Sequence, residues 1–199
     1  MKYQLRDYQK KASDAAVMYF KMKSGRNGLL VLPTGAGKSL IIADIAARLE
    51  EPLIVFQPNK EILEQNFAKL QTYGIWDCSI YSASVGRKEI SRITFATIGS
   101  VIRHMKDFQH FKNILIDECH LVKPSDGMYK RFFEQAERRI VGLTATPYRL
   151  YSCMNGSMLK FLTRTRPRVF SQVLYYCQVS ELLAKGFLSR LKYYDVTRI

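Results

Sequence analysis

Short apolar runs alternate along this chain with longer segments in which apolar residues recur every three or four positions. The short runs predict buried strands, and the longer segments predict helices with one buried face. We expect strands over residues 29–32, 53–56, 78–81, 93–96, 114–116 and 140–143. We expect helices over residues 3–23, 38–50, 60–72, 98–105 and 127–138. This alternation predicts an α/β fold in which helices cover both faces of a parallel β-sheet.

The pattern weakens near the C-terminal end, where basic residues outnumber acidic ones. A short helix over 181–185 would have Ser180 as its N-cap and Gly186 after its last turn. The remaining elements expected there are a loop at 151–156, a strand at 169–177 and the start of a strand within 188–196. The predicted organisation is one α/β domain over 1–149 and a basic extension over 150–199.

A loop of small residues separates the first expected strand from the helix at 38–50. It consists of Pro33, Thr34, Gly35, Ala36 and Gly37, followed by Lys38 and Ser39. Small residues let the backbone wrap closely, so that N–H groups can point at a polyphosphate, and the helix N-terminus adds further donors. Lys38 would reach the outer phosphates, and the hydroxyl of Ser39 would ligate Mg²⁺.

One position departs from this phosphate-binding pattern. The strict motif has glycine at position 32, where this chain has Leu32. The alternative interpretation is an ordinary strand-to-helix loop that contains Gly-Lys-Ser by chance. The strand before the loop and the helix after it favour a nucleoside triphosphate site.

The strand at 114–116 ends in Asp117, Glu118, Cys119 and His120. A carboxylate at a buried strand end can hold hydrated Mg²⁺, and Asp117 is the candidate. Glu118 could orient and deprotonate the attacking water, because phosphoryl transfer depends mainly on positioning and charge neutralisation. His120 is either a link to other motifs or a surface histidine, and Cys119 is expected to be a packing residue. The alternative for the segment is a polar cap on a core strand.

The charge of the chain points to a polyanionic partner. The 199 residues carry a formal net charge of +14, and 47% of them are hydrophobic, which fits a folded protein. Nucleic acid would explain the positive charge, although a solvated basic surface is the alternative. No apolar run is long enough for a membrane span, and the N-terminus has no signal-peptide core. The four cysteines lack zinc or disulfide spacing, so we expect a cytoplasmic location and no membrane partner.

Six short motifs occur in an order and spacing typical of one protein family. They are LRDYQ at 5–9, PTGAGKS at 33–39, PNKEILEQ at 58–65, TIGS at 97–100, DECH at 117–120 and TATP at 144–147. Together they resemble the first motor domain of superfamily 2 helicases, which has a RecA-like P-loop NTPase fold. Tyr148-Arg149 and the later SELLAKGFL segment resemble the restriction-enzyme and DNA-repair branch that contains RadD-like bacterial helicases.

The resemblance implies particular roles for the site residues. ATP and Mg²⁺ would be the cofactors, with ATP bound by the loop at 33–39. Gln9 would read the edge of the adenine, and Arg6 would pack on the base, tasks that suit a planar amide and a guanidinium. Thr144 and Thr146 would link hydrolysis to domain movement.

The resemblance also implies a nucleic-acid surface. Positions that touch the nucleic-acid backbone in the family correspond to Pro58, Asn59, Lys60, Gln65, Thr97, Gly99 and Ser100. Family members often have Pro-Thr-Arg where this chain has Pro58-Asn59-Lys60, a difference that would alter how phosphates are held.

The function implied is that of the ATP-binding motor domain of a DNA helicase or translocase, which couples ATP hydrolysis to movement on nucleic acid. Such helicases use a second RecA-like domain that supplies an arginine finger, and nothing after residue 149 resembles one. The extension at 150–199 would lead toward that domain, and this chain alone would hydrolyse ATP poorly.

Three alternatives stay open. They are an ATP-dependent RNA helicase, a different P-loop enzyme such as a small-molecule kinase, and a non-enzymatic module that binds nucleic acid. A kinase has no need for Gln9 or for the paired TIGS and TATP segments. An inactive module would not need the retained Lys38, Ser39, Asp117 and Glu118.

Overall fold

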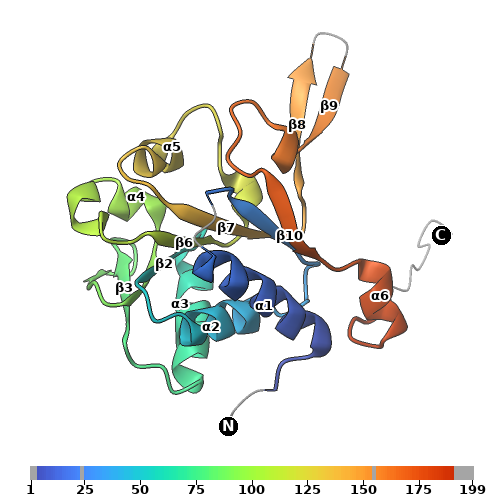
Figure 1. Ribbon diagram of the computed structural model, residues 1–199, viewed down its shortest axis with the longest axis horizontal. Coiled ribbons are helices and arrows are strands. Elements are labelled where there is room, and N and C mark those ends of the chain that lie inside the picture. The colour runs from blue at the N-terminus through green and yellow to red at the C-terminus, as the bar shows by residue number, and fades with distance from the viewer. Residues whose placement is uncertain (1–3, 23–24, 154–155, 191–199) are drawn as a thin grey trace, which may run out of the picture.

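The computed structural model describes residues 4–22, 25–153 and 156–190 and contains an eight-stranded sheet with the strand order β10-β1-β7-β6-β2-β5-β3-β4 (Figure 1). All pairs of neighbouring strands are parallel except β3 and β4. The strands are β1 Gly28–Val31, β2 Leu53–Phe56, β3 Cys78–Ser82, β4 Arg87–Lys88, β5 Ile93–Ala96, β6 Asn113–Ile116, β7 Arg139–Thr144 and β10 Gln172–Tyr176. Every strand predicted from the apolar runs before residue 149 is present.

Helices cover both faces of the sheet, as predicted. One face carries α1 Asp7–Lys21, α2 Lys38–Arg48 and α3 Lys60–Thr72, and the other carries α4 Ile98–Val101, α5 Met128–Phe133 and the 3₁₀ turn Met105–Phe108. Alternate strand residues point to opposite faces, so that Leu29 belongs to the core cluster on the face of α4 and α5, and Leu30 to the cluster on the face of α1 and α2. No helix in the described ranges is long and apolar enough to cross a membrane.

Two predicted helices end earlier than expected. The helix predicted to reach residue 105 ends at Val101, because the chain turns to bury the ring of Phe108 against Tyr81. The helix predicted to reach residue 138 ends at Phe133. Arg138 is buried with its guanidinium over the ring of Phe132, where it donates to the carbonyl of Phe111 at 2.7 Å. Tertiary contacts therefore override helical periodicity in both segments.

The loop predicted at 151–156 is wrong. Residues 151–153 and 156 belong to the strands of an antiparallel hairpin, β8 Tyr148–Cys153 and β9 Gly156–Phe161, which is a separate two-stranded sheet. The hairpin projects from the main sheet (Figure 1). Cross-strand pairs such as Tyr148 with Phe161 stabilise it, since their rings meet edge to face at 6.5 Å.

The main sheet continues past residue 149. The predicted strand at 169–177 is present as β10, which lies at the sheet edge beside β1. The next helix, α6 Val179–Ala184, begins after Gln178, so the prediction of Ser180 as its N-cap is wrong. Gly186 follows the helix in a left-handed conformation, as predicted.

The last predicted element, a strand within 188–196, lies largely outside the described residues. The described part of it, residues 188–190, is not a strand. Because β10 belongs to the main sheet, part of the extension at 150–199 is built into the domain. Whether the extension also leads to a further domain stays a prediction.

Candidate active site

The phosphate loop, residues 33–39, joins β1 to α2. Gly35 and Gly37 have φ angles of +79° and +77°, in the left-handed region that residues with a side chain rarely adopt. A Cβ atom at Gly37 would lie 2.5 Å from Nε2 of Gln9, so a side chain there would collide with it. Gly37 is also the N-cap of α2, whose first N–H groups have no acceptor within the helix. Leu32, which departs from the strict motif, is fully buried in the core.

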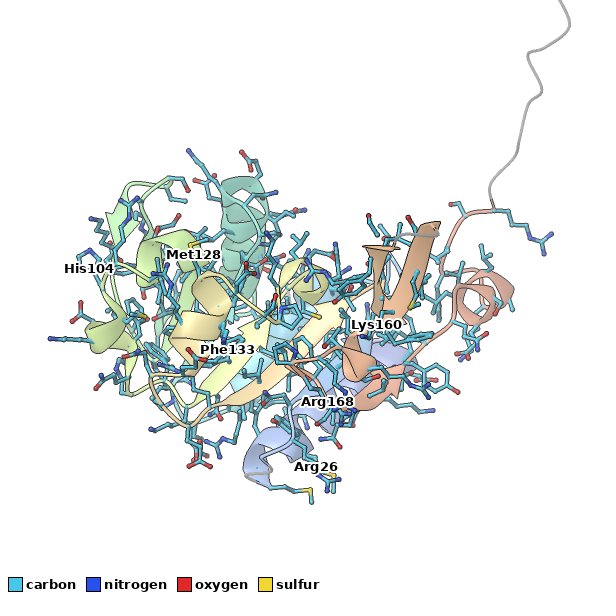
Figure 2. The ribbon with its side chains drawn as sticks, turned by 90° about the horizontal axis from the view of Figure 1, so that it is seen from above. Arg26, His104, Met128, Phe133, Lys160 and Arg168 are labelled. Atoms are coloured by element: carbon cyan, nitrogen blue, oxygen red, sulfur yellow. The ribbon has the colours of Figure 1, made fainter. Side chains whose placement is uncertain are left out.

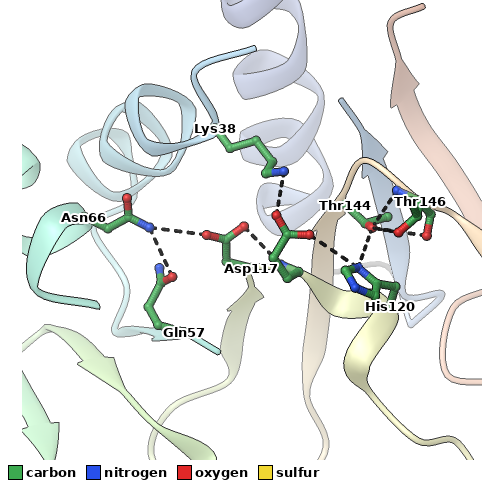
Figure 3. A network of polar contacts seen from close by, with 8 residues as sticks. Lys38, Gln57, Asn66, Asp117, His120, Thr144 and Thr146 are labelled. Carbon is green, nitrogen blue, oxygen red and sulfur yellow. Dashed lines mark hydrogen bonds and ion pairs between the residues drawn. The ribbon is translucent and has the colours of Figure 1, made fainter. Parts of the chain in front are cut away.

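A series of polar contacts links the phosphate loop to two other strand ends (Figure 3). Nζ of Lys38 lies 2.7 Å from Oε1 of Glu118, and Oε2 of Glu118 lies 3.3 Å from Nδ1 of His120. The same Nδ1 lies 3.1 Å from the hydroxyl of Thr144, which accepts a hydrogen bond from the backbone N–H of Thr146 at 3.0 Å. Side chains from three separate motifs therefore lie in one network.

Glu118 has an unusual backbone conformation. Its φ is +48°, and it is the only residue other than glycine with a positive φ in the described part of the chain. This conformation is strained for a residue with a side chain, and such residues cluster at active sites. Glu118 lies between β6 and the 3₁₀ turn Cys119–Leu121, in a position from which its carboxylate contacts both Lys38 and His120.

Asp117 lies at the end of β6 and is 5% exposed. Its Oδ1 accepts a hydrogen bond from the backbone N–H of Glu118 at 3.0 Å, and its Oδ2 accepts one from Nδ2 of Asn66 at 3.3 Å. Burial raises the pKa of Asp117 to about 6; the charge of Lys38 lowers this pKa and that of Glu118 raises it. A buried carboxylate suits a divalent cation, whose charge would offset the cost of removing the carboxylate from water.

Asn66 is a site residue that the motif comparison missed. It also donates to Oε1 of Gln57 at 3.1 Å, and both side chains are buried. Asn66 lies on the face of α3 that packs on the sheet, whereas the predicted Gln65 beside it is exposed. A polar residue on the apolar face of a predicted helix was the signal that could have found it.

The N-terminus of α1 lies against the phosphate loop. Nε2 of Gln9 and the hydroxyl of Tyr8 both donate to the carbonyl of Ala36 at 2.9 Å. Oε1 of Gln9 accepts a hydrogen bond from the backbone N–H of Arg6 at 2.9 Å. The Gln9 amide retains one N–H and one lone pair with which it could contact a base. The structure thus brings Gln9 to the loop, and its contact with adenine stays a prediction.

The residues predicted to contact nucleic acid lie at the ends of β2 and β5, which are adjacent parallel strands. Pro58, Thr97 and Gly99 line a cavity of about 470 Å³ that extends to Asp117 and Glu118. The structure therefore brings these three residues next to the acidic end of β6, whereas Asn59, Lys60, Gln65 and Ser100 do not line the cavity. Binding of nucleic acid in this cavity stays a prediction.

Three residues of this group use their side chains within the protein. The hydroxyl of Thr97 lies 3.2 Å from that of Ser82 and 3.0 Å from that of Ser100. Oδ1 of Asn59 accepts a hydrogen bond from the backbone N–H of Ile62 at 2.9 Å and so caps α3. The hydroxyl of Ser100 is buried and accepts a hydrogen bond from the backbone N–H of Ala83 at 2.8 Å. In contrast, Lys60 is exposed at the start of α3.

Two basic residues of the extension, Lys160 and Arg168, lie away from this cavity. Seen from above, Lys160 of β9 and Arg168 lie toward the other side of the molecule from His104 and from Met128, which lines the cavity (Figure 2). Lys160 and Arg168 therefore lie apart from the predicted nucleic-acid groove.

Cys119 has the packing role predicted for it. Its side chain is fully buried, and a Cβ atom at Gly142 would lie 2.6 Å from its Sγ. Burial raises the pKa of its thiol, which keeps the thiol protonated and unreactive.

Several helicases and translocases match most of this chain. A DNA 3′-5′ translocase, XPB2, from Sulfurisphaera tokodaii is 30% identical over 151 residues, which cover 74% of this chain and 32% of the relative. The DNA 3′-5′ helicase XPB from Mycobacterium tuberculosis is 29% identical over 154 residues, which cover 72% of this chain and 27% of the relative. The chain thus spans about a third or less of the length of these relatives.

A solved structure has the same fold. The SWI2/SNF2 ATPase core of Sulfolobus solfataricus, solved in complex with dsDNA, matches 74% of this chain and 33% of its own chain with a TM-score of 0.61 and 21% identity. This likeness confirms the predicted RecA-like architecture. The family model of the type III restriction enzyme res subunit matches residues 2–149, which include all six sequence motifs. The chain therefore belongs to the family of the type III restriction enzyme res subunit, among the superfamily 2 helicases.

Proposed function

We propose that this chain is the ATP-binding motor domain of a DNA helicase or translocase, in which ATP hydrolysis drives movement on DNA. The observation that carries the proposal is the contact between Lys38 and Glu118 at 2.7 Å. It joins a phosphate loop to an acidic strand end, the two parts that a nucleoside triphosphatase needs side by side. The network continues through His120 to Thr144, so the site has a physical connection to a further motif.

In this proposal ATP binds the loop at 33–39, and Ser39 and Asp117 hold Mg²⁺. The residues fit the ion, because Asp117 is a desolvated carboxylate whose anionic form gains from a nearby cation. Bound Mg²⁺ neutralises charge on the phosphates. Lys38 contributes a second positive charge, and Glu118 accepts a proton from the attacking water.

DNA is the proposed nucleic acid. The supporting observation is that the names of the two relatives described above specify DNA, and the net charge of +14 fits any nucleic acid. The proposed path follows the ends of β2 and β5, along Pro58, Lys60, Gln65, Thr97 and Gly99. Thr97, Asn59 and Ser100 contribute backbone groups, since their side chains are engaged within the protein. An RNA helicase is the second candidate.

The whole protein would contain a second RecA-like domain, reached through the extension at 150–199, that contributes an arginine finger. Such a finger can contribute roughly 10³ to 10⁵ in rate, so we expect this chain alone to turn over ATP slowly. We place it in the restriction-enzyme and DNA-repair branch, with a cytoplasmic location, on the resemblance of Tyr148-Arg149 and the segment at 180–188.

Calorimetric titration of this chain with ATP and Mg²⁺ tests the proposal. Lys38→Ala removes the cation of the loop and should weaken binding at least about tenfold, since charge-assisted hydrogen bonds contribute about 1.5–3 kcal/mol each. Lys112→Ala is the matched control, because Lys112 is exposed just before β6, at the opposite edge of the sheet. Equal affinity of Lys38→Ala and the parent would overturn the assignment.

A further inference from the structure

The segment that follows α6 turns back toward the start of the chain. Gly186 has a φ of +68°, and the backbone N–H groups of Phe187 and Leu188 both donate to the carbonyl of Leu182, at 2.8 and 3.3 Å. These bonds close the C-terminal end of α6 and fix the direction in which the next two side chains leave the backbone. Both of them lie half-buried against the nucleotide site.

Phe187 contacts two residues of the LRDYQ motif, Arg6 and Tyr8. The guanidinium of Arg6 lies over the ring of Phe187, 4.3 Å from its centroid. The ring of Tyr8 packs against the same ring with a centroid distance of 5.7 Å, and the Tyr8 hydroxyl donates to the carbonyl of Ala36. Phe187 is therefore tied to the phosphate loop through one intervening side chain.

Leu188 reaches the phosphate loop directly. A Cβ atom at Gly35 would lie 3.0 Å from Cδ2 of Leu188, so the leucine borders the loop where its backbone is left-handed. The segment after α6 thus contacts both ends of the candidate site, the side with Arg6 and the side with the phosphates. None of the six sequence motifs includes it.

We propose that Phe187 positions Arg6 for binding of a purine base, in a stack of aromatic ring, guanidinium and base. This inference rests on the proposed function and deepens it. A guanidinium is planar and has two faces. One face of Arg6 lies on Phe187, and the Arg6 side chain is exposed, which leaves room for a base on the other face. Phe187 is a positioning residue, because it acts through Arg6 and does not touch the phosphates.

The physical role of Phe187 is to reduce the freedom of a long side chain. Without the ring, the exposed Arg6 would sample many rotamers, and a base would have to order it on binding. The ring supplies a cation–π contact that holds the guanidinium flat before the base arrives. Loss of the Phe187 ring should therefore weaken the binding of ligands that have a base. It should leave unchanged the binding of ligands that have only phosphates.

The test is calorimetric titration of the chain with two probes, ATP and inorganic tripolyphosphate, each with Mg²⁺. Phe187→Leu keeps an apolar side chain against Tyr8 and removes the ring. We expect it to weaken ATP binding about three- to fivefold, the fold-change that corresponds to an exposed cation–π contact, and to leave tripolyphosphate binding unchanged. Phe187→Tyr should restore ATP affinity. Phe161→Leu is the matched control, since Phe161 is 50% exposed on the hairpin.

A double-mutant cycle with Arg6→Leu separates positioning from direct contact. If Phe187 acts through Arg6, the double variant binds ATP no more weakly than Arg6→Leu alone. Additive losses, parent-like ATP affinity of Phe187→Leu, or an equal loss for both probes would each overturn the inference while leaving the proposed function intact. Failure of the parent chain to bind either probe would overturn both. Thermal unfolding of each variant shows whether the fold is retained.

Discussion

The ammonium group of Lys38 lies 2.7 Å from the carboxylate of Glu118, and both side chains are largely shielded from water. A nucleotide that takes up Lys38 with its phosphates must therefore compete with Glu118 for the same cation. The ion pair orders the Lys38 side chain before the nucleotide binds. It has to be broken when the phosphates bind Lys38. Glu118 thus affects nucleotide affinity as well as turnover.

The first prediction concerns Glu118→Gln. This change removes the proton acceptor and should lower ATP turnover by about 10² to 10⁴. It should also strengthen ATP binding by about threefold or more, for two reasons. Lys38 no longer has to break an ion pair to bind the phosphates, and the negative charge of Glu118 near the phosphates is removed. Calorimetry measures the affinity, and phosphate release measures the turnover. Weaker binding by Glu118→Gln would contradict this account of the ion pair.

The second prediction concerns the pH dependence of stability. The pKa of Asp117 is raised by burial to about 6 from 3.8, so the folded state binds a proton more tightly than the unfolded state. This stabilising contribution is fully present below about pH 4 and is lost as the pH rises through about 6. Asparagine is neutral at every pH in this range, so Asp117→Asn lacks this pH-dependent contribution to stability.

The free energy of unfolding of Asp117→Asn should therefore rise relative to the parent between pH 4 and pH 7, by up to about 3 kcal/mol. Urea unfolding at pH 4.5 and pH 7.5 measures the difference. The exposed Asp126 offers the matched control Asp126→Asn. A difference between Asp117→Asn and the parent that does not change with pH would show that burial does not raise this pKa.

The third prediction concerns Thr144→Val. The hydroxyl of Thr144 is fully buried and accepts the backbone N–H of Thr146, so an isosteric valine leaves that N–H without its acceptor. We expect the free energy of unfolding to fall by about 1–3 kcal/mol, the cost of an unsatisfied buried donor. Urea unfolding measures it, with Thr163→Val as the control outside the network. If both variants lose the same amount, the Thr144 hydroxyl has no special structural role.

The fourth prediction concerns the nucleic-acid groove. Binding of single-stranded DNA should weaken steeply with added salt, because cations condensed on the strand are released. Lys60→Ala should reduce the slope of log affinity against log salt by about 0.7, the value for one lost contact to a single strand. Lys112→Ala, at the opposite edge of the sheet, should leave the slope unchanged. Fluorescence anisotropy at several salt concentrations measures both, and equal slopes for the two variants would remove Lys60 from the path.

Local patterns were sufficient to predict the central part of the fold. Strands β2 and β5 and helix α3 have the bounds expected from apolar runs and helical spacing. The two strands are continuous apolar runs, and the helix has apolar residues at helical spacing. Both patterns are set by residues that are close together in the sequence. The loop at 33–39 could be predicted for the same reason, since its glycines and the helix start after it are local features.

Contacts between distant segments decided the rest. α5 ends early because Arg138 is buried over Phe132, and the hairpin forms because residues 148–153 find a pairing partner in 156–161. Neither effect leaves a periodic pattern in the sequence. The placement of β10 beside β1 likewise depends on a hydrogen-bonded partner more than a hundred residues away.

The candidate site also combines residues that the sequence predicted with contacts that only the tertiary structure determined. Motif order indicated that the phosphate loop, Asp117, Glu118 and Thr144 belong together, because strand ends of a parallel sheet meet at one edge. The sequence places a polar residue, Asn66, on the apolar face of a helix, but it did not indicate that Asn66 donates to Asp117 or that Phe187 lies on Arg6. Those contacts require helix α3 and the end of α6 to pack in one particular orientation, which only the assembled core determines.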